Sequence, residues 1–142
     1  MHGFNKLNAS TVPAQTPIVR KDVVIDGMAK STIFLSMDLM DGFYQTLMRE
    51  RDIPLTAVST SSGMLWEGLT MPQGLRNDPA TFNRCVTNLL RSVQDLVPSY
   101  LGDVCVHSRA MNGKTDVEAH RTHVLQVLTL MRKDRGIQDL SF

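Results

Sequence analysis

The sequence predicts an α+β fold in which antiparallel strands are backed by helices. Two features of the chain predict this class. Short stretches of alternating apolar and polar residues end at turns, whereas two longer segments carry apolar residues at helical spacing. The elements follow in the order strand, helix, hairpin, helix, hairpin, helix. With 142 residues, of which 42% are hydrophobic, the chain is expected to form one domain around one core.

The first expected strand covers residues 31–38. Residues 1–30 before it show weak periodicity, and Pro13 and Pro17 bracket a stretch that we expect to be extended or looped. Asp38 ends the strand on the face away from the core. The core face carries three alternating apolar residues: Ile33, Leu35 and Met37.

A helix and a hairpin are expected next. Gly42 breaks the strand, and residues 43–49 have helical character until Pro54 stops the helix. Residues 55–70 predict two antiparallel strands, because a turn at residues 61–63 separates two apolar runs.

A fixed loop and an amphipathic helix follow the hairpin. Residues 71–74, Met-Pro-Gln-Gly, suit neither a strand nor a helix. Asp78 suits the N-cap of a helix and Pro79 its first turn. The apolar residues of this helix recur at helical spacing: Phe82, Val86, Leu89, Leu90 and Val93.

The last third of the chain predicts a second hairpin and a second long helix. Gly102-Asp103 lies between two short apolar runs, which is typical of a tight hairpin tip. Asn112-Gly113 predicts another turn. Thr115 and Glu118 form a capping-box pattern, so a helix is expected from there to about residue 133. Its apolar residues are Val117, Val124, Val127, Leu128 and Met131.

Composition excludes several classes of protein. The net charge of +1 gives no global field that attracts nucleic acid, and local basic clusters are better explained as solvated surface. No apolar run approaches the roughly 18 residues of a transmembrane helix, and residues 1–10 lack the apolar centre of a signal peptide. Two distant cysteines argue against a disulfide framework. We therefore expect an intracellular chain without a membrane segment.

Two acids at expected strand ends carry the most specific chemistry. Asp38 and Asp103 are the kind of carboxylates that hold two divalent ions about 3.5–4 Å apart in phosphoryl transfer. Aspartates at turns are more often solvated than catalytic, and spacing alone favours that plainer interpretation.

Four segments together resemble the reverse transcriptase domain of gypsy-class LTR retrotransposons and of the retroviral Pol polyprotein. The resemblance covers roughly residues 4–133. Residues 36–45 are similar to the first acidic motif of that family. Residues 71–82 are similar to its Met/Leu-Pro-x-Gly-Leu-x-Asn-x-Pro-x-x-Phe element, residues 100–103 to its Tyr-x-Asp-Asp box, and residues 120–128 to the helix after the box.

The resemblance implies a role for each candidate site residue. Asp38 and Asp103 would be the catalytic acids that bind Mg²⁺ or Mn²⁺. Asp41 would lie where the backbone meets the incoming deoxynucleoside triphosphate, and Phe43 would stack under its sugar and exclude a 2′-hydroxyl. Gln73 would lie in the loop that touches the templating pair. The implied partners are an RNA or DNA template-primer and deoxynucleoside triphosphates.

The resemblance also implies a division of the chain. Residues 1–30 would be a remnant of the fingers, residues 31–133 a partial palm with part of the fingers, and residues 134–142 a divergent C-terminal tail. The family's upstream fingers strands, its thumb and its ribonuclease H domain are not recognised in the sequence. We therefore expect a weak grip on the template, and self-association through apolar faces left uncovered.

Gly102 departs from the family at the position of the first acid of the box. Successive strand residues face opposite sides, so Asp103 is not expected to replace that acid. We expect little or no polymerase activity. The alternatives are a non-catalytic remnant that binds nucleic acid or protein, and a weaker case, a metal-dependent nuclease using Asp38, Asp41 and Asp103.

His120 and His123 lie one helical turn apart, which is the spacing of half a zinc site. No further cysteine or histidine joins them at metal-ligand spacing. We therefore favour surface or capping histidines.

Overall fold

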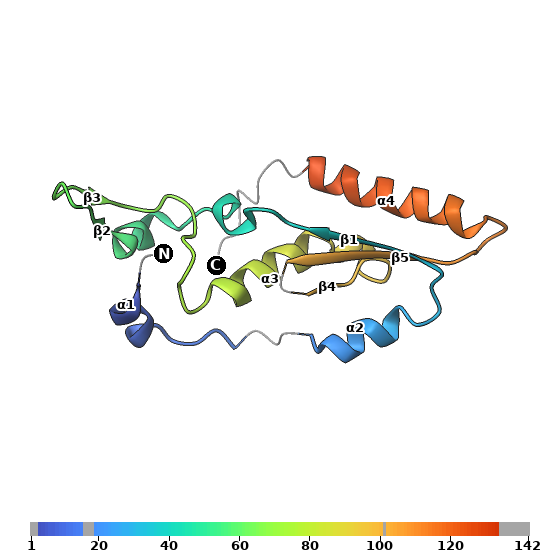
Figure 1. The fold of residues 1–142 in the computed structure, drawn as a ribbon, viewed down its shortest axis with the longest axis horizontal. Helices are drawn as coiled ribbons and strands as arrows, with labels where there is room; N and C mark the ends of the chain where they lie inside the picture. The colour runs from blue at the N-terminus through green and yellow to red at the C-terminus, as the bar shows by residue number, and fades with distance from the viewer. Residues whose placement is uncertain (1–2, 16–18, 101, 134–142) are drawn as a thin grey trace.

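A three-stranded antiparallel sheet lies at the centre of the computed structural model, which describes residues 3–15, 19–100 and 102–133 (Figure 1). The strand order is β1 (Ile33–Asp38), β5 (Asp103–Ser108) and β4 (Ser99–Tyr100). The register of β1 on β5 runs from the pair Ile33 and Ser108 to the pair Asp38 and Asp103. The first strand and the last hairpin are therefore confirmed, within an α+β arrangement.

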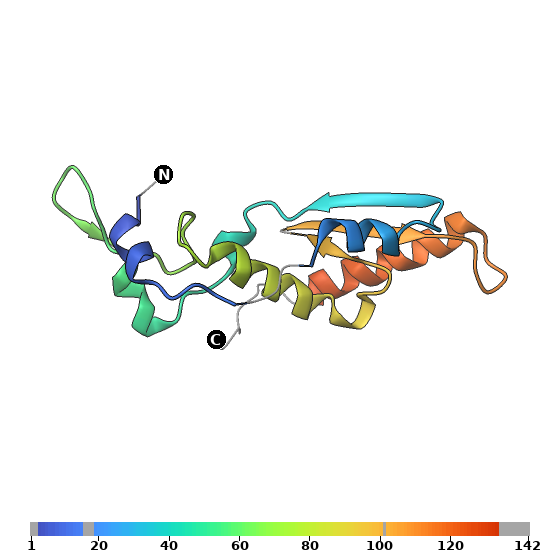
Figure 2. The same cartoon turned by 90° about the horizontal axis from the view of Figure 1, so that it is seen from below.

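Helices cover both faces of this sheet. Helix α2 (Lys21–Gly27) lies on one side of it, and α4 (Asp116–Lys133) lies on the other (Figures 1 and 2). Helix α3 (Asp78–Leu89) packs on the same face as α4. A 3-10 turn, η3 (Arg91–Val93), follows α3.

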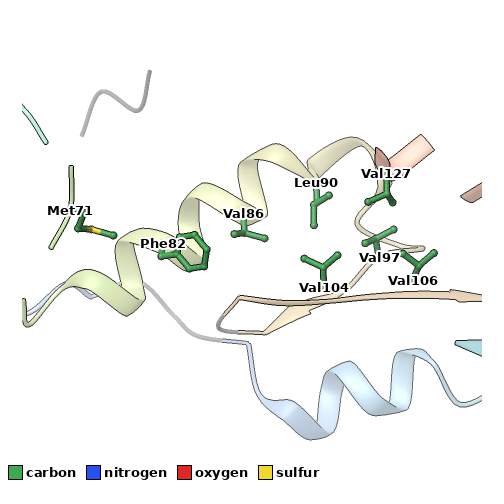
Figure 3. Close-up of a cluster of buried hydrophobic side chains, with 8 residues drawn as sticks. All are labelled: Met71, Phe82, Val86, Leu90, Val97, Val104, Val106 and Val127. Atoms are coloured by element: carbon green, nitrogen blue, oxygen red, sulfur yellow. The ribbon is translucent and has the colours of Figure 1, made fainter. Parts of the chain in front are cut away.

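The core forms between α3, α4 and one face of β5. Val104 and Val106 point from β5 toward α3, and Val127 reaches them from α4 (Figure 3). The expected apolar stripe is confirmed at its buried positions, which are Phe82 and Val86 in α3 and Leu90 directly after it. Leu35 and Met37 of β1, which pair with Val106 and Val104, also pack against this core. Because side chains alternate along a strand, the residues between them face the other side of the sheet.

Two short helices were not predicted. Residues expected to be irregular form α1 (Asn5–Ser10) and α2, and no residue of either helix is fully buried. An apolar stripe is the main sequence signal for a helix, so a helix without a buried face leaves little pattern to detect.

The helix expected over residues 43–49 is wrong. The chain forms a 3-10 turn, η1 (Gly42–Gln45), and then extends, so that Leu47 bridges to Thr70. A second 3-10 segment, η2 (Glu50–Thr56), contains Pro54 instead of ending at it. Short 3-10 turns do not need the unbroken series of i to i−4 hydrogen bonds that proline interrupts.

The first hairpin is confirmed, although it is shorter than expected. Its strands are β2 (Val58–Ser59) and β3 (Leu65–Trp66), and they pair in antiparallel register. The hairpin lies with α1 at one end of the molecule, away from the central sheet (Figure 1).

The capping box of α4 is confirmed, but the buried face of α4 differs from the expected one. Glu118 accepts hydrogen bonds from the backbone N–H and the hydroxyl of Thr115, at 3.0 and 3.2 Å. Val127 is buried as expected, but Val117 is 64% exposed, and the buried stripe consists of Ala119, His123 and Val127. A polar residue in that stripe hid the true face from the apolar pattern. No helix in the described ranges is long and apolar enough to span a membrane.

Candidate active site

Asp38 and Asp103 lie directly opposite each other on β1 and β5. Opposed residues of an antiparallel pair point to the same face, with their Cβ atoms about 4.5–5.5 Å apart. The preceding pair, Met37 and Val104, faces the core, so both carboxylates lie on the face away from α3 and α4. Both side chains are exposed. The fold thus brings together two acids that are far apart in the sequence.

The turn before Asp103 differs by one residue from the expected one. Tyr100 pairs with Asp103, so Asp103 is the first residue of β5 and not the tip of the hairpin. Gly102 precedes it with a φ of +106°, a conformation that L-residues rarely adopt. The backbone N–H of Leu39 donates to the carbonyl of Gly102 at 3.4 Å, which ties this turn to the end of β1.

The ring of Phe82 supports both segments that carry the acids. Phe82 is only 3% exposed. A Cβ at Gly102 would lie 3.2 Å from its Cε1 atom, and a Cβ at Gly42 would lie 2.5 Å from its Cε2 atom. Gly42 therefore has to be glycine for the chain to cross the ring this closely. A side chain at position 102 would point toward the Phe82 ring, whereas the side chains of Asp38 and Asp103 point to the other face of the sheet.

Asp41 and Phe43 flank the close contact at Gly42. Asp41 has a φ of +55° and is exposed, and its carbonyl accepts a hydrogen bond from the N–H of Tyr44 at 2.9 Å. The half-buried ring of Phe43 packs on the ring of Phe82, with 4.9 Å between the centroids. Phe82 therefore connects Phe43 and Asp41 to the acid pair.

Gln73 lies in a separate loop, residues 71–77, and its side chain is exposed. The loop is held at both sides. Asn8 of α1 donates from Nδ2 to the carbonyl of Gly74 at 2.8 Å and accepts from the N–H of Arg76 at 2.8 Å. The N–H of Met71 donates to the carbonyl of Thr46 at 2.8 Å. The loop is thus positioned by α1 and by the chain after η1.

Asp78 is a functional candidate that the sequence interpretation missed. It was expected to be the N-cap, but Asn77 is the N-cap and Asp78 lies inside α3. Its carboxylate is buried and accepts the N–H groups of Gly74 and Leu75 at 3.1 and 2.8 Å. Burial raises the pKa of Asp78 to about 6, against the opposing effect of the hydrogen bonds from Leu75 and Gly74. The sequence signal for this contact is an aspartate that follows a glycine-containing loop and precedes a proline, because its carboxylate can accept the N–H groups of that loop.

His123 is not a surface histidine, contrary to the expectation. It is 8% exposed, and its Nδ1 atom lies 2.7 Å from the hydroxyl of Ser108. His120 shares the same hydroxyl at 3.0 Å.

The acid pair fits a hard divalent ion better than it fits zinc. Mg²⁺ is commonly bound by one or two carboxylates, with substrate phosphates and water in the remaining positions. Within the described part of the chain, no three His, Cys, Asp or Glu side chains are grouped to hold a metal ion. Asp38 and Asp103 could supply two carboxylates to such an ion.

The sequence of the chain is similar to those of known proteins. A family model described as reverse transcriptase (RNA-dependent DNA polymerase) matches residues 3–137. The Pol polyprotein from the Drosophila melanogaster transposon 297 is 42% identical over 111 residues, which are 76% of this chain and 10% of the polyprotein. The Pol polyprotein from transposon opus of the same organism is 34% identical over 92% of this chain and 12% of the polyprotein. The chain thus spans about a tenth of the length of these curated relatives.

Solved structures show the same fold at low sequence identity. The foamy viral protease-reverse transcriptase in complex with double-stranded DNA superimposes with a TM-score of 0.78 and 18% identity, over 92% of this chain and 22% of the other. The foamy viral protein in complex with an RNA/DNA hybrid gives a TM-score of 0.72, also at 18% identity, over 92% of this chain and 17% of the other.

Proposed function

Because the chain belongs to the reverse transcriptase (RNA-dependent DNA polymerase) family, we propose that its ancestral reaction is RNA-directed DNA synthesis, with Asp38 and Asp103 as the remaining metal-binding acids. The observation that carries this proposal is their direct pairing across β1 and β5. A polymerase site needs its acids on rigid neighbouring elements, and two paired strands meet that need.

We assign the chain to the gypsy-like branch of this family, and its β1–β5–β4 sheet to the palm. The Pol polyprotein of the Drosophila melanogaster transposon gypsy is 29% identical over 88% of this chain. In this proposal residues 31–133 are the palm with part of the fingers, residues 1–30 are a fingers remnant, and residues 134–142 are a divergent tail.

The other site residues have positioning and recognition roles in this proposal. Asp41 presents backbone beside the incoming triphosphate, and Phe43 stacks under the sugar while Phe82 holds its ring. Gln73 contacts the templating base pair from the loop that α1 and Asp78 anchor. The partners are a template-primer and deoxynucleoside triphosphates.

Asp38 and Asp103 would hold Mg²⁺ or Mn²⁺ together with the phosphates of the nucleotide. Such an ion, when bound, neutralises the charge on phosphate oxygens and lowers the pKa of the attacking hydroxyl. Two carboxylates without the acid that Gly102 replaces give a weakened site. We therefore propose that the chain has little or no polymerase activity in its present form.

The test is primer extension on an RNA template, with Mg²⁺ and with Mn²⁺, by three purified proteins. These are the chain itself, Gly102→Asp, and Asp38→Ala as the inactive control. We expect no extension by the chain above the control. Template-dependent extension by the unchanged chain would refute the inactivity. Extension by Gly102→Asp alone would show that one missing carboxylate silences an otherwise competent scaffold.

A non-catalytic binding function is the second candidate, and the replacement of an acid by Gly102 favours it. If neither the chain nor Gly102→Asp extends a primer, this second candidate is tested by the binding of labelled template-primer, measured by fluorescence anisotropy. Binding that is equal for the chain and for Asp38→Ala would support a remnant that holds nucleic acid without the metal site.

A further inference from the structure

Three histidines gather at the end of the sheet opposite to the acid pair. The register of β1 on β5 places Asp103 at one end of β5 and Ser108 at the other. His107 lies on β5 beside Ser108, and His120 and His123 lie on α4. We call His107, Ser108, His120 and His123 the histidine cluster. Of these residues, His107, Ser108 and His123 line a cavity of about 410 Å³ that also reaches the end of α2.

One hydroxyl joins two of these histidines to the sheet. The Oγ atom of Ser108 lies 3.0 Å from Nδ1 of His120 and 2.7 Å from Nδ1 of His123. A hydroxyl has one proton to donate, so it donates to one imidazole and accepts an N–H from the other. In the neutral cluster the two imidazoles therefore hold different tautomers, and Ser108 links α4 to β5 through both.

Two histidines of the cluster are buried. His123 is 8% exposed in the middle of the stripe that α4 packs on the sheet, and His107 is 9% exposed. The Nδ1 atom of His107 lies 2.8 Å from the hydroxyl of Ser31. Burial lowers the pKa of His107, and the nearby His123 and Arg109 lower it further, against a hydrogen bond to the carbonyl of Asp95.

The charged groups around the cluster come from every neighbouring segment. Asp26 and Lys30 line the cavity from the α2 side, Asp95 from the chain before β4, and Arg109 from the chain after β5. On α4, Asp116 is linked to the Ser108 end of the sheet through the hydroxyl of Thr32, at 3.0 Å. No salt bridge within the described ranges involves a histidine of the cluster.

We propose that the histidine cluster is an acid-sensitive latch that holds α4 on the sheet. The first added proton is accommodated, because the hydroxyl of Ser108 can rotate and accept from both imidazoles. The second proton places two imidazolium ions on one oxygen beside His107 and Arg109, without an ion-paired carboxylate. When both protons are bound in acid, α4 leaves the sheet and uncovers the valines of β5.

Amide hydrogen exchange between pH 7.5 and pH 5.5 tests this latch on the unmodified chain, without metal or nucleic acid. After correction for intrinsic exchange rates, we expect protection in α4 to fall by about tenfold or more, while α3 stays protected. Protection in α4 that is the same at pH 5.5 as at pH 7.5 would overturn the proposal.

Variants separate the latch from other titrating groups. His123→Leu should remove most of the acid sensitivity of α4, because it replaces the central imidazole with an apolar group of similar size. His123→Gln serves the same comparison if the leucine variant does not fold. Lys30→Gln is the matched control, since it changes a charge at the cavity without touching Ser108. If the pH dependence of α4 is the same in His123→Gln or His123→Leu as in the unmodified chain, the latch is refuted.

Discussion

Gly102 carries no carboxylate, and in addition its backbone conformation favours glycine. Its φ of +106° is a region that costs an L-residue roughly 1–2 kcal/mol, and the place of its Cβ lies 3.2 Å from the Phe82 ring. An aspartate restored there must shift the turn before its carboxylate reaches the face of Asp38. The position therefore lacks a metal ligand in our proposal, and its backbone conformation also favours glycine.

We predict that Gly102→Ala lowers the free energy of unfolding by about 2–3 kcal/mol, from backbone strain together with the contact on Phe82. Urea denaturation measures this change. Gly63→Ala is the matched control, because Gly63 also has a positive φ, +79°, but its Cβ would meet nothing within 4 Å. Gly102→Ala should cost about 1 kcal/mol more than Gly63→Ala. Equal losses would mean that Phe82 does not constrain the turn.

The junction of the 71–77 loop with α3 is the element whose stability depends most on one ionisable group. Asp78 binds two loop N–H groups through the same carboxylate oxygen, and its pKa is raised to about 6 by burial. A raised carboxyl pKa stabilises the fold below the unfolded value of 3.8, and this contribution is lost as the pH rises through about 6.

We predict that Asp78→Asn becomes more stable relative to the unmodified chain as the pH rises from about 4 to about 7.5. The amide oxygen keeps both hydrogen bonds without burying a charge, so the difference in unfolding free energy should move by about 1–2 kcal/mol in favour of the variant, after allowance for solvent screening. Urea denaturation at a series of pH values measures it. Asp116→Asn, which lies on α4 and has no such burial, is the control. A flat difference across this range would contradict the prediction.

Long helices were predictable from the sequence, and short ones were not. Helix α3 shows three buried apolar residues on one stripe, so its pattern survives in the sequence. Helices α1 and α2 bury no residue completely, and in α4 a histidine takes a core position because Ser108 satisfies it. The formation of α1 and α2 and the burial of His123 depend on contacts with residues distant in the sequence, and a local apolar pattern does not record such contacts.

At the scale of the whole molecule, the β2–β3 hairpin presents apolar side chains to solvent. Leu65 is 71% exposed and Trp66 is 63% exposed, and Met64 and Leu69 beside them are also exposed. Neighbouring exposed apolar residues of this size commonly mark an interaction surface. This surface is the one through which we expect self-association.

We predict that the chain associates in a concentration-dependent way and that Leu65→Ser with Trp66→Ser weakens the association by at least about tenfold. Sedimentation velocity over a range of concentrations measures it. Val12→Ser removes an even more exposed apolar side chain outside the hairpin and should leave association unchanged. A monomeric unmodified chain, or equal weakening by Val12→Ser, would contradict the prediction.

The sequence allowed Asp38 and Asp103 to be predicted as metal-binding acids at a strand end and a hairpin tip, but it did not specify how they pair. Their register on β1 and β5 is a long-range property of the fold, and so is the contact of Phe82 with Gly42 and Gly102. Phe82 itself was predicted as one apolar residue of an ordinary stripe. Its position under both acid-bearing segments depends on how α3 packs, which periodicity along one helix does not specify.

The pairing of β1 with β5 also determines when the acid pair can exist during folding. Asp38 and Asp103 are 65 positions apart, and closing a flexible loop of that length costs roughly 4 kcal/mol of chain entropy before any contact forms. Contacts of this separation generally slow folding. The carboxylates therefore come together only after the whole span through β5 has been synthesised and has condensed. A ribosome-bound chain that ends before residue 103 has no acid pair at all.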